Sequence, residues 1–98
     1  MRLAITRTGF YNADYYCADS RSAKKLLREK SISILAIDYY LVGREDGCDV
    51  LLWAEQNRVL PSYVVVIERA RDKRQHLVQS LINLGYRSND DVNFVKAH

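Results

Sequence analysis

The spacing of apolar and polar positions along the chain predicts strands that alternate with helices. Short apolar or aromatic runs bounded by turn residues are typical of strands. Apolar residues at helical spacing, between an N-cap and a stop signal, are typical of amphipathic helices. The predicted strands are 3–6, 15–17, 32–37, 63–67 and 92–95, and the predicted helices are 20–30, 48–57 and 72–84.

Two of these strands carry apolar residues at both odd-numbered and even-numbered positions, so that neither face of the strand is polar. Ile32–Ile37 contains one polar residue, Ser33, and Val64–Ile67 contains none. A strand with one face in water would alternate, so both strands are expected to be central and buried on both faces. Strands that alternate with helices imply a mainly parallel sheet. We therefore predict an α/β, flavodoxin-like, five-stranded sheet of order 2-1-3-4-5, formed by residues 1–98 as a single domain.

The helix from 48 to 57 has a clear inward stripe of Val50, Leu51 and Ala54. Trp53 widens this stripe and is expected in the core. Leu52 lies about 100° round the helix from Leu51, so we expect it to be at least partly exposed.

Composition narrows the class of protein. The chain has 98 residues, of which 48% are hydrophobic and 28% are charged, as in an ordinary soluble globule. No apolar run reaches the roughly 20 residues of a membrane span, and the N-terminus lacks a signal-peptide pattern. Cys17 and Cys48 alone give neither a disulfide framework nor zinc-site spacing. We expect a cytoplasmic protein with reduced, half-buried thiols.

Several polar side chains follow the ends of predicted parallel strands. The carboxyl ends of such strands meet at one edge of the sheet, where ligands bind in open α/β folds. The residues expected at that edge are Thr6, Arg7, Asp38, Tyr39, Glu68, Arg69 and Lys96. From this edge and its surroundings, the candidate binding residues are Asp38, Tyr39, Arg44, Glu68, Arg69, Arg71 and Arg74, and the candidate catalytic residues are Asp38 and Lys96.

Three stretches of the sequence resemble response-regulator receiver domains. They are Ile34–Gly43, Asp46–Trp53 and Asp90–Lys96. Among such domains, the chain more closely resembles a small receiver-like family that is named for cyclic-phosphate processing. This resemblance implies that Asp38 matches the phospho-accepting Asp and Lys96 the receiver Lys. It also implies two acidic residues after the first strand, which with the acceptor Asp would hold Mg²⁺.

The chain departs from this pattern where the acidic pair should stand. Thr6 and Arg7 occupy those positions, and Glu68 with Arg69 occupies the position of the phosphate-reading residue. Without two carboxylates the metal loses most of its ligand charge, and Arg7 repels it. We therefore expect no cofactor and no bound Mg²⁺, and a non-catalytic receiver-like module with a binding or regulatory role.

Two other functions stay open. The first is processing of a phosphate ester, with Asp38 as nucleophile or base and Lys96 and Arg69 as partners of the oxyanion. The second is nucleic-acid binding through a basic rim that includes Arg71 and Arg74; the net charge of +3 and pI of about 9.0 permit this without arguing for it. Acidic residues interleave with the rim, which favours an ordinary solvated surface. Asp38 as a structural cap, or as a partner of Lys96 or Arg69, is the plainer interpretation.

The expected helices leave one sheet face open. The segment 7–14 is too short for a regular first helix, and the chain ends at His98 directly after the last strand, so both receiver helices of one face are missing. An uncovered apolar face favours a homodimer; a partner protein is the other candidate. A lid formed by residues 9–14 is expected to cover the face only in part. We expect Ser33, Leu35, Ile37 and the Phe10–Tyr11 loop to face the second copy, rather than the alternate set Ile32, Ile34 and Ala36.

Overall fold

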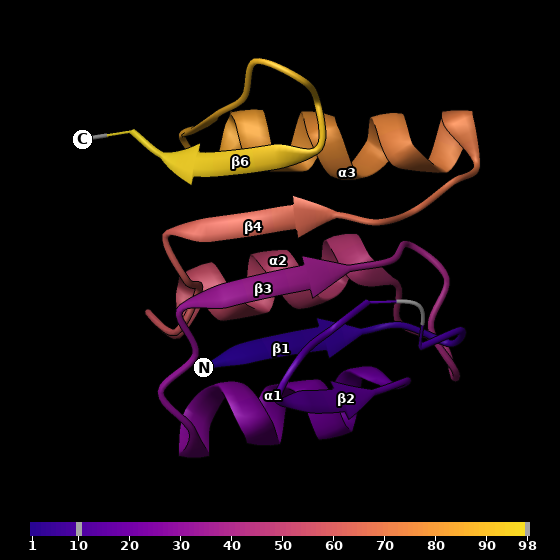
Figure 1. The fold of residues 1–98 in the computed structure, drawn as a ribbon, viewed down its shortest axis with the longest axis vertical. Helices are drawn as coiled ribbons and strands as arrows, with labels where there is room; N and C mark the ends of the chain where they lie inside the picture. Colours follow the sequence, from indigo (N-terminus) through magenta and orange to yellow (C-terminus); the bar gives the residue numbers. More distant parts are fainter. Residues whose placement is uncertain (10, 98) are drawn as a thin grey trace.

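The computed structural model describes residues 1–9 and 11–97. The elements in chain order are β1 (Arg2–Ile5), β2 (Tyr15–Cys17), α1 (Ser20–Glu29), β3 (Ile34–Ile37), α2 (Gly47–Gln56), β4 (Tyr63–Val66), α3 (Arg71–Asn83), β5 (Tyr86–Arg87) and β6 (Asn93–Lys96) (Figure 1). Every predicted strand and helix is confirmed to within two residues at each end. The short strand β5 was not predicted.

The sheet is mixed rather than purely parallel. Within the described residues it has six strands in the order β2-β1-β3-β4-β6-β5. The four strands β2, β1, β3 and β4 pair in parallel and confirm the predicted order 2-1-3-4. The predicted fifth position is wrong, because β6 runs antiparallel to β4 and β5 runs antiparallel to β6. Strand β5 runs in the same direction as β4. Strand β6 turns back from β5 as a hairpin and lies between β4 and β5.

A tight turn between β5 and β6 explains the hairpin. Antiparallel strands need only a short turn, whereas parallel strands need a crossover of a dozen or more residues. The carboxylate of Asp90 accepts hydrogen bonds from the backbone amides of Val92 (2.9 Å) and Asn93 (2.8 Å) and from the Asn93 side chain (2.9 Å). These donors hold the pKa of the Asp90 carboxyl well below its usual range. Asp91 completes the turn with a φ of 57°.

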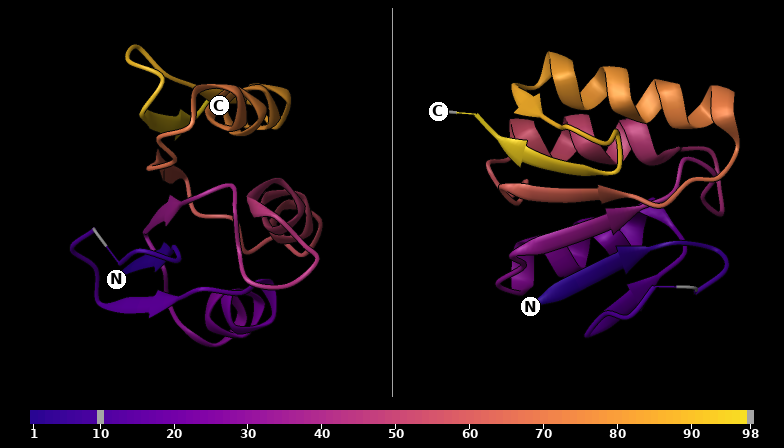
Figure 2. Two further views of the ribbon diagram at one scale, coloured as in Figure 1. Left: turned by 90° about the vertical axis from the view of Figure 1, so that its right-hand side faces the viewer. Right: turned by 45° about the horizontal axis from the view of Figure 1, so that its top comes forward.

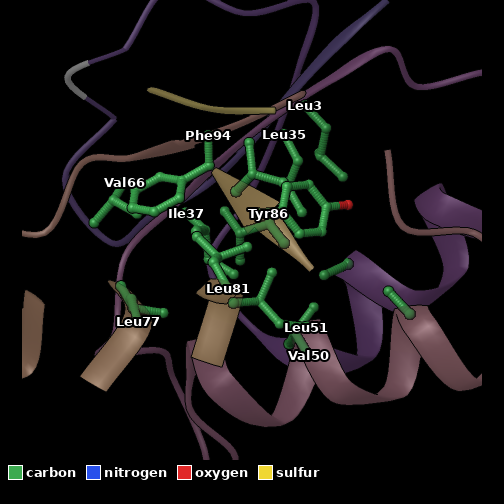
Figure 3. Close-up of a cluster of buried hydrophobic side chains, with 14 of the residues drawn as sticks. Leu3, Leu35, Ile37, Val50, Leu51, Val66, Leu77, Leu81, Tyr86 and Phe94 are labelled. Carbon is green, nitrogen blue, oxygen red and sulfur yellow. The ribbon is translucent and has the colours of Figure 1, made fainter. Parts of the chain in front are cut away.

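The helices α1, α2 and α3 all lie on one face of the sheet, as expected (Figure 2). Between this face and the helices lies the main core (Figure 3), in which Leu35 and Ile37 are fully buried beside Leu51, Leu77 and Leu81. Side chains alternate along a strand, so the prediction that Leu35 and Ile37 face a second copy is wrong. The alternate set, with Ile34 and Ala36, points away from the helices. None of the described helices is long and apolar enough to cross a membrane.

The face opposite the helices, here called the front face, is crossed by the connection from β1 to β2. The described part of this connection takes the place of a crossover helix, and the left view of Figure 2 shows it on the side of the sheet away from the helices. Tyr11 and Ala13 pack against a small cluster of buried residues on that face, namely Ala4, Ala36 and Val65. The hydroxyl of Tyr16 donates to the carbonyl of Tyr11 and so ties the segment to β2. The lid therefore forms and covers part of the face; Phe10 lies outside the described residues.

A row of side chains remains beside the lid on the front face. Strand pairing aligns them as Arg2, Ile34, Tyr63, Val95 and Arg87 across β1, β3, β4, β6 and β5. Val95 is 49% exposed, as is Tyr16 near the other edge of the sheet. The hydroxyl of Tyr63 donates to Oδ1 of Asn93 at 2.9 Å. The front face is thus apolar in the middle and carries an arginine at each end of this row.

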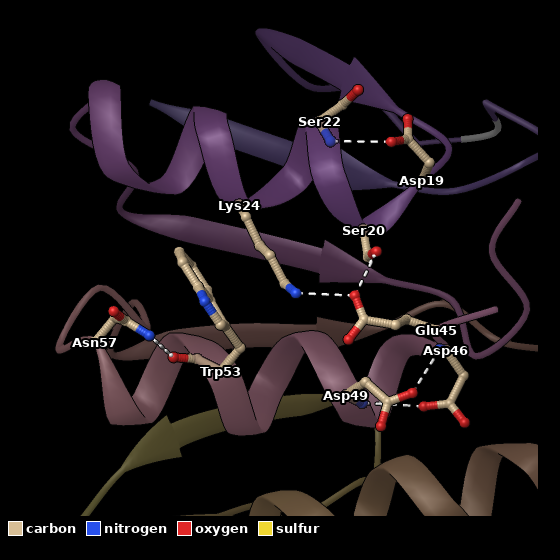
Figure 4. Close-up of polar contacts among 9 residues, drawn as sticks. All are labelled: Asp19, Ser20, Ser22, Lys24, Glu45, Asp46, Asp49, Trp53 and Asn57. Carbon is tan, nitrogen blue, oxygen red and sulfur yellow. Dashed lines mark hydrogen bonds and ion pairs between the residues drawn. The ribbon is translucent and has the colours of Figure 1, made fainter. Parts of the chain in front are cut away.

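Two predictions concern the outward-facing and flanking residues of α2. Leu52 is 52% exposed, as expected. Trp53 is half-buried, and the Lys24 ammonium lies 5.6 Å from its ring centroid (Figure 4). The Arg28 guanidinium lies at the same distance from that centroid. The indole packs against the edge of the core beside these two cationic side chains of α1, so the prediction that it widens the inward stripe is confirmed.

Candidate functional site

The parallel strands β1, β3 and β4 end at the same edge of the sheet and open there into a groove of about 770 Å³. Figure 1 shows these ends at the right, where the arrowheads point. The groove is lined by Arg7, Thr8, Asp38, Tyr40, Val66, Ile67, Glu68, Arg69, Arg74 and Val92. The prediction that polar residues after these strands gather at one edge is confirmed for Arg7, Asp38, Glu68 and Arg69.

Asp38 lines the groove directly after β3. Its carboxylate accepts a hydrogen bond from the hydroxyl of Thr6, which is itself buried at the end of β1. Burial raises the pKa of Asp38 above its usual value, and the nearby Glu68 adds to this; the Thr6 hydrogen bond and the Arg69 charge oppose it in part. Asp38 therefore holds a proton more readily than a carboxyl in water does.

Glu68 is fully engaged in holding two loops together. One oxygen of its carboxylate accepts from the backbone amides of Tyr39 (2.9 Å) and Tyr40 (3.4 Å). The other oxygen accepts from the amides of Arg69 (3.1 Å) and Ala70 (3.2 Å). The carboxylate thus joins the loop after β3 to the loop that leads into α3, and both oxygens are occupied by backbone donors.

Arg74, which also lines the groove, has a similar structural role. Its guanidinium donates to the carbonyl oxygens of Val66 (3.4 Å) and Glu68 (3.1 Å). It also donates to the carbonyl of Asp91 and so braces the β5–β6 turn against the end of β4. Arg74 therefore shapes the groove, and its donors are directed at backbone oxygens of the protein itself.

The loop between β3 and α2 is anchored where it enters α2. Glu45 accepts from Lys24 (2.8 Å) and from Ser20 (2.7 Å), both on α1 (Figure 4). Asp46 and Asp49 form a reciprocal capping box at the start of α2. This fixes the chain that follows Asp38 and keeps the groove wall in place.

The two tyrosines after Asp38 point in different directions. Tyr40 is 47% exposed and lines the groove. The Tyr39 ring packs toward α3, with its centroid 5.6 Å from that of His76. Lys73 lies 5.2 Å from the Tyr39 centroid, and a hydrogen bond with Asp46 raises the pKa of Tyr39 to about 12. The prediction of Tyr39 as a binding residue is not supported by its position, because its side chain does not line the groove.

Other predicted site residues lie elsewhere. Lys96 is at the opposite edge of the sheet, because β6 is antiparallel to β4. Its ammonium donates to the carbonyl of Leu84 at 2.6 Å and pairs with Glu55 at 3.5 Å. A partnership of Asp38 with Lys96 is therefore wrong. Arg44 and Arg71 are exposed and do not line the groove.

Six lining residues were not among the predicted binding residues: Arg7, Thr8, Tyr40, Val66, Ile67 and Val92. Arg7 was expected at this edge but was not proposed to bind. Val92 enters the groove because of the β5–β6 hairpin. The turn-forming run Ser88–Asp91 was the available signal, since so short a connection is typical of a hairpin.

The residues of the groove do not fit the Mg²⁺ that the receiver resemblance implies. Among residues 1–9 and 11–97, no three His, Cys, Asp or Glu side chains lie close enough together to hold a metal ion. The Glu68 oxygens are engaged by backbone amides, and Thr6 takes one Asp38 oxygen. Hard divalent cations need several free oxygen ligands, which this groove does not supply.

Comparisons with protein-family models, with curated proteins and with solved structures gave no match to this chain. The architecture is therefore stated as it stands: a mixed α/β sheet domain with a parallel core of order β2-β1-β3-β4 and a groove at the carboxyl ends of its strands.

Proposed function

We propose that the protein is a non-catalytic, receiver-like binding module, in which Asp38 shapes a ligand groove and does not accept a phosphoryl group. The observation that carries this proposal is the hydrogen bond from Thr6 to the Asp38 carboxylate. In a receiver, the residues after the first strand bring negative charge for a metal ion. Here the same place brings a hydroxyl donor and the cationic Arg7.

The chemistry of phosphoryl transfer supports the same conclusion. The transition state spreads negative charge over three oxygens, which a metal ion and a positioned Lys must neutralise. Lys96 lies at the other edge of the sheet, and the groove carboxylates do not fit a metal. Arg69 remains near Asp38, but one guanidinium does not replace a metal and a lysine.

Incubation with acetyl phosphate, or with beryllofluoride, in the presence of Mg²⁺ tests this proposal. We expect the intact mass of the protein to stay unchanged after acetyl phosphate and the melting temperature to stay unchanged with beryllofluoride. Stoichiometric phosphorylation that disappears in Asp38→Asn would overturn the proposal. So would hydrolysis of a phosphodiester that depends on Asp38.

We also propose that the module is a homodimer that buries the front face against a second copy. Support comes from Tyr16 and Val95, each 49% exposed, and from the partly buried Ile34 and Tyr63. Two-fold dimers are the commonest oligomers, and a stable contact buries about 1,200–2,000 Å² in total. Sedimentation at low micromolar concentration should show the dimer. A folded, non-aggregating monomer of 11.4 kDa would show that the lid alone covers the front face sufficiently, and it would contradict the dimer.

A further inference from the structure

The groove contains two guanidinium groups that the fold does not use. Arg7 and Arg69 are exposed, line the groove, and form no ion pair with any described residue. The remaining charged side chains of the lining are Arg74, Glu68 and Asp38, and these are hydrogen-bonded to backbone groups or to Thr6. The free hydrogen-bonding capacity of the groove is therefore dominated by two cationic donors.

Part of the groove lining is apolar. Ile67 and Val92 are partly buried and pack on the same small cluster as Ala36 and Val65, so this part of the lining continues onto the front face. Tyr40 adds an aromatic ring that is 47% exposed. The groove thus offers both cationic and apolar lining within a single hollow.

We propose that this groove binds a small amphipathic anion, with its carboxylate or phosphate head between Arg7 and Arg69 and its apolar body against Ile67 and Val92. Guanidinium groups form strong, paired hydrogen bonds with such heads. Glu68 and Asp38 reduce this attraction only in part, because both oxygens of Glu68 already accept from backbone amides and burial favours the uncharged form of Asp38. The inference rests on the proposed binding function of the groove.

Amide chemical shifts measured during titration test the proposal. The probes are phenyl phosphate, phenylacetate, inorganic phosphate and phenol, which separate the head from the body and the phosphate from the carboxylate. We expect phenyl phosphate or phenylacetate to shift the amides of Thr8, Ile67, Arg69 and Val92, with weaker effects from inorganic phosphate and from phenol. Equal binding of inorganic phosphate and phenyl phosphate would overturn the apolar half of the proposal, and no shift from either aromatic anion would overturn all of it.

Substitutions localise the site. Arg7→Gln and Arg69→Gln should each weaken binding at least about tenfold, as expected for loss of a charge-assisted hydrogen bond. Arg44→Gln removes the same charge from an exposed loop outside the groove and should change nothing. If all three variants weaken binding equally, the loss of affinity reflects the net charge of the protein, and the proposed site is wrong.

The same samples keep the two proposals apart. Intact mass and phosphate release report on catalysis, and chemical shifts report on binding. Binding without turnover supports both proposals. Turnover of phenyl phosphate contradicts the non-catalytic module, whereas the absence of binding contradicts only the amphipathic-anion site.

Discussion

Gly47 lies against the backbone carbonyl oxygen of Asp38, so closely that a methyl group on its Cα would overlap that oxygen. Its amide donates to the carbonyl of Tyr39 at 2.8 Å. The first residue of α2 is therefore packed directly on the chain that carries the groove carboxylate, and only a hydrogen atom fits between them.

This contact makes Gly47→Ala a sharp test. Replacing Gly by Ala within a helix ordinarily stabilises it by about 0.5–1 kcal/mol. At Gly47 we expect the opposite sign, a loss of about 3 kcal/mol in the free energy of unfolding, because the backbone after β3 must shift. Urea denaturation measures this loss. Gln56→Ala, at an exposed position near the end of the same helix, should change stability by less than about 0.5 kcal/mol. A stabilised Gly47→Ala variant would contradict the contact.

The protonation of Asp38 predicts a pH-dependent gain in stability. Its pKa in the folded protein is raised, so the stabilisation from its bound proton is full below the unfolded pKa of about 3.9 and is lost as the pH rises through the folded pKa. Asp38→Asn removes the buried charge and still accepts from Thr6. We expect this variant to melt at a higher temperature than the wild type at neutral pH, with the difference vanishing in acid.

Asp90 provides the control of opposite sign. Its pKa is lowered, so its stabilisation is present above the unfolded pKa and is lost as the pH falls. Asp90→Asn should therefore melt at a lower temperature than the wild type at neutral pH. If both variants shift the melting temperature in the same direction, the environment assigned to Asp38 is wrong.

Exposed apolar residues on opposite faces offer a matched pair for the dimer. Val95 on the front face and Leu52 on α2 are 49% and 52% exposed. Each change to Lys should cost under about 1 kcal/mol in folding of the monomer. Val95→Lys should nevertheless dissociate the dimer, because it places a charge beside Arg87 in the proposed interface, whereas Leu52→Lys should leave it intact. Sedimentation velocity distinguishes them, and the same oligomeric state for both variants would contradict the front-face contact.

The cysteines should react slowly. Burial, with a smaller effect of Asp19, raises the pKa of Cys17 to about 12, and burial also raises that of Cys48. At pH 8 the reactive thiolate of Cys17 is then on the order of one molecule in ten thousand. Reaction with a thiol reagent should be slow in the native protein and fast in denaturant. Fast native labelling at Cys17 would contradict its burial.

Much of the parallel core could be predicted because its strands carry an unambiguous pattern. Ile32–Ile37 and Val64–Ile67 lack a polar alternation, which placed both in the centre of the sheet. Because both alternating sets of positions in these strands are apolar, the pattern did not indicate which set faces the helices. Which set faces the helices depends on how Leu51, Leu77 and Leu81 pack against the sheet. The spacing of residues within one strand does not determine this packing.

The candidate site was predictable only where strand direction was known. Asp38, Glu68 and Arg69 come together because β3 and β4 are parallel. Lys96 was misplaced because the direction of β6 depends on a turn rather than on its own apolar pattern. The structural tasks of Glu68 and Arg74 involve backbone partners that residue types alone do not specify.

The reversed direction of β6 has a practical consequence for experiments. It brings the end of the described chain, Ala97, to the same side of the sheet as Met1, and Figure 1 shows both ends opposite the arrowheads of β1, β3 and β4. The groove opens at the other side. An affinity tag, a surface linker or a fused fluorescent protein can therefore be attached at either end of the chain while ligands keep free access to Arg7 and Arg69.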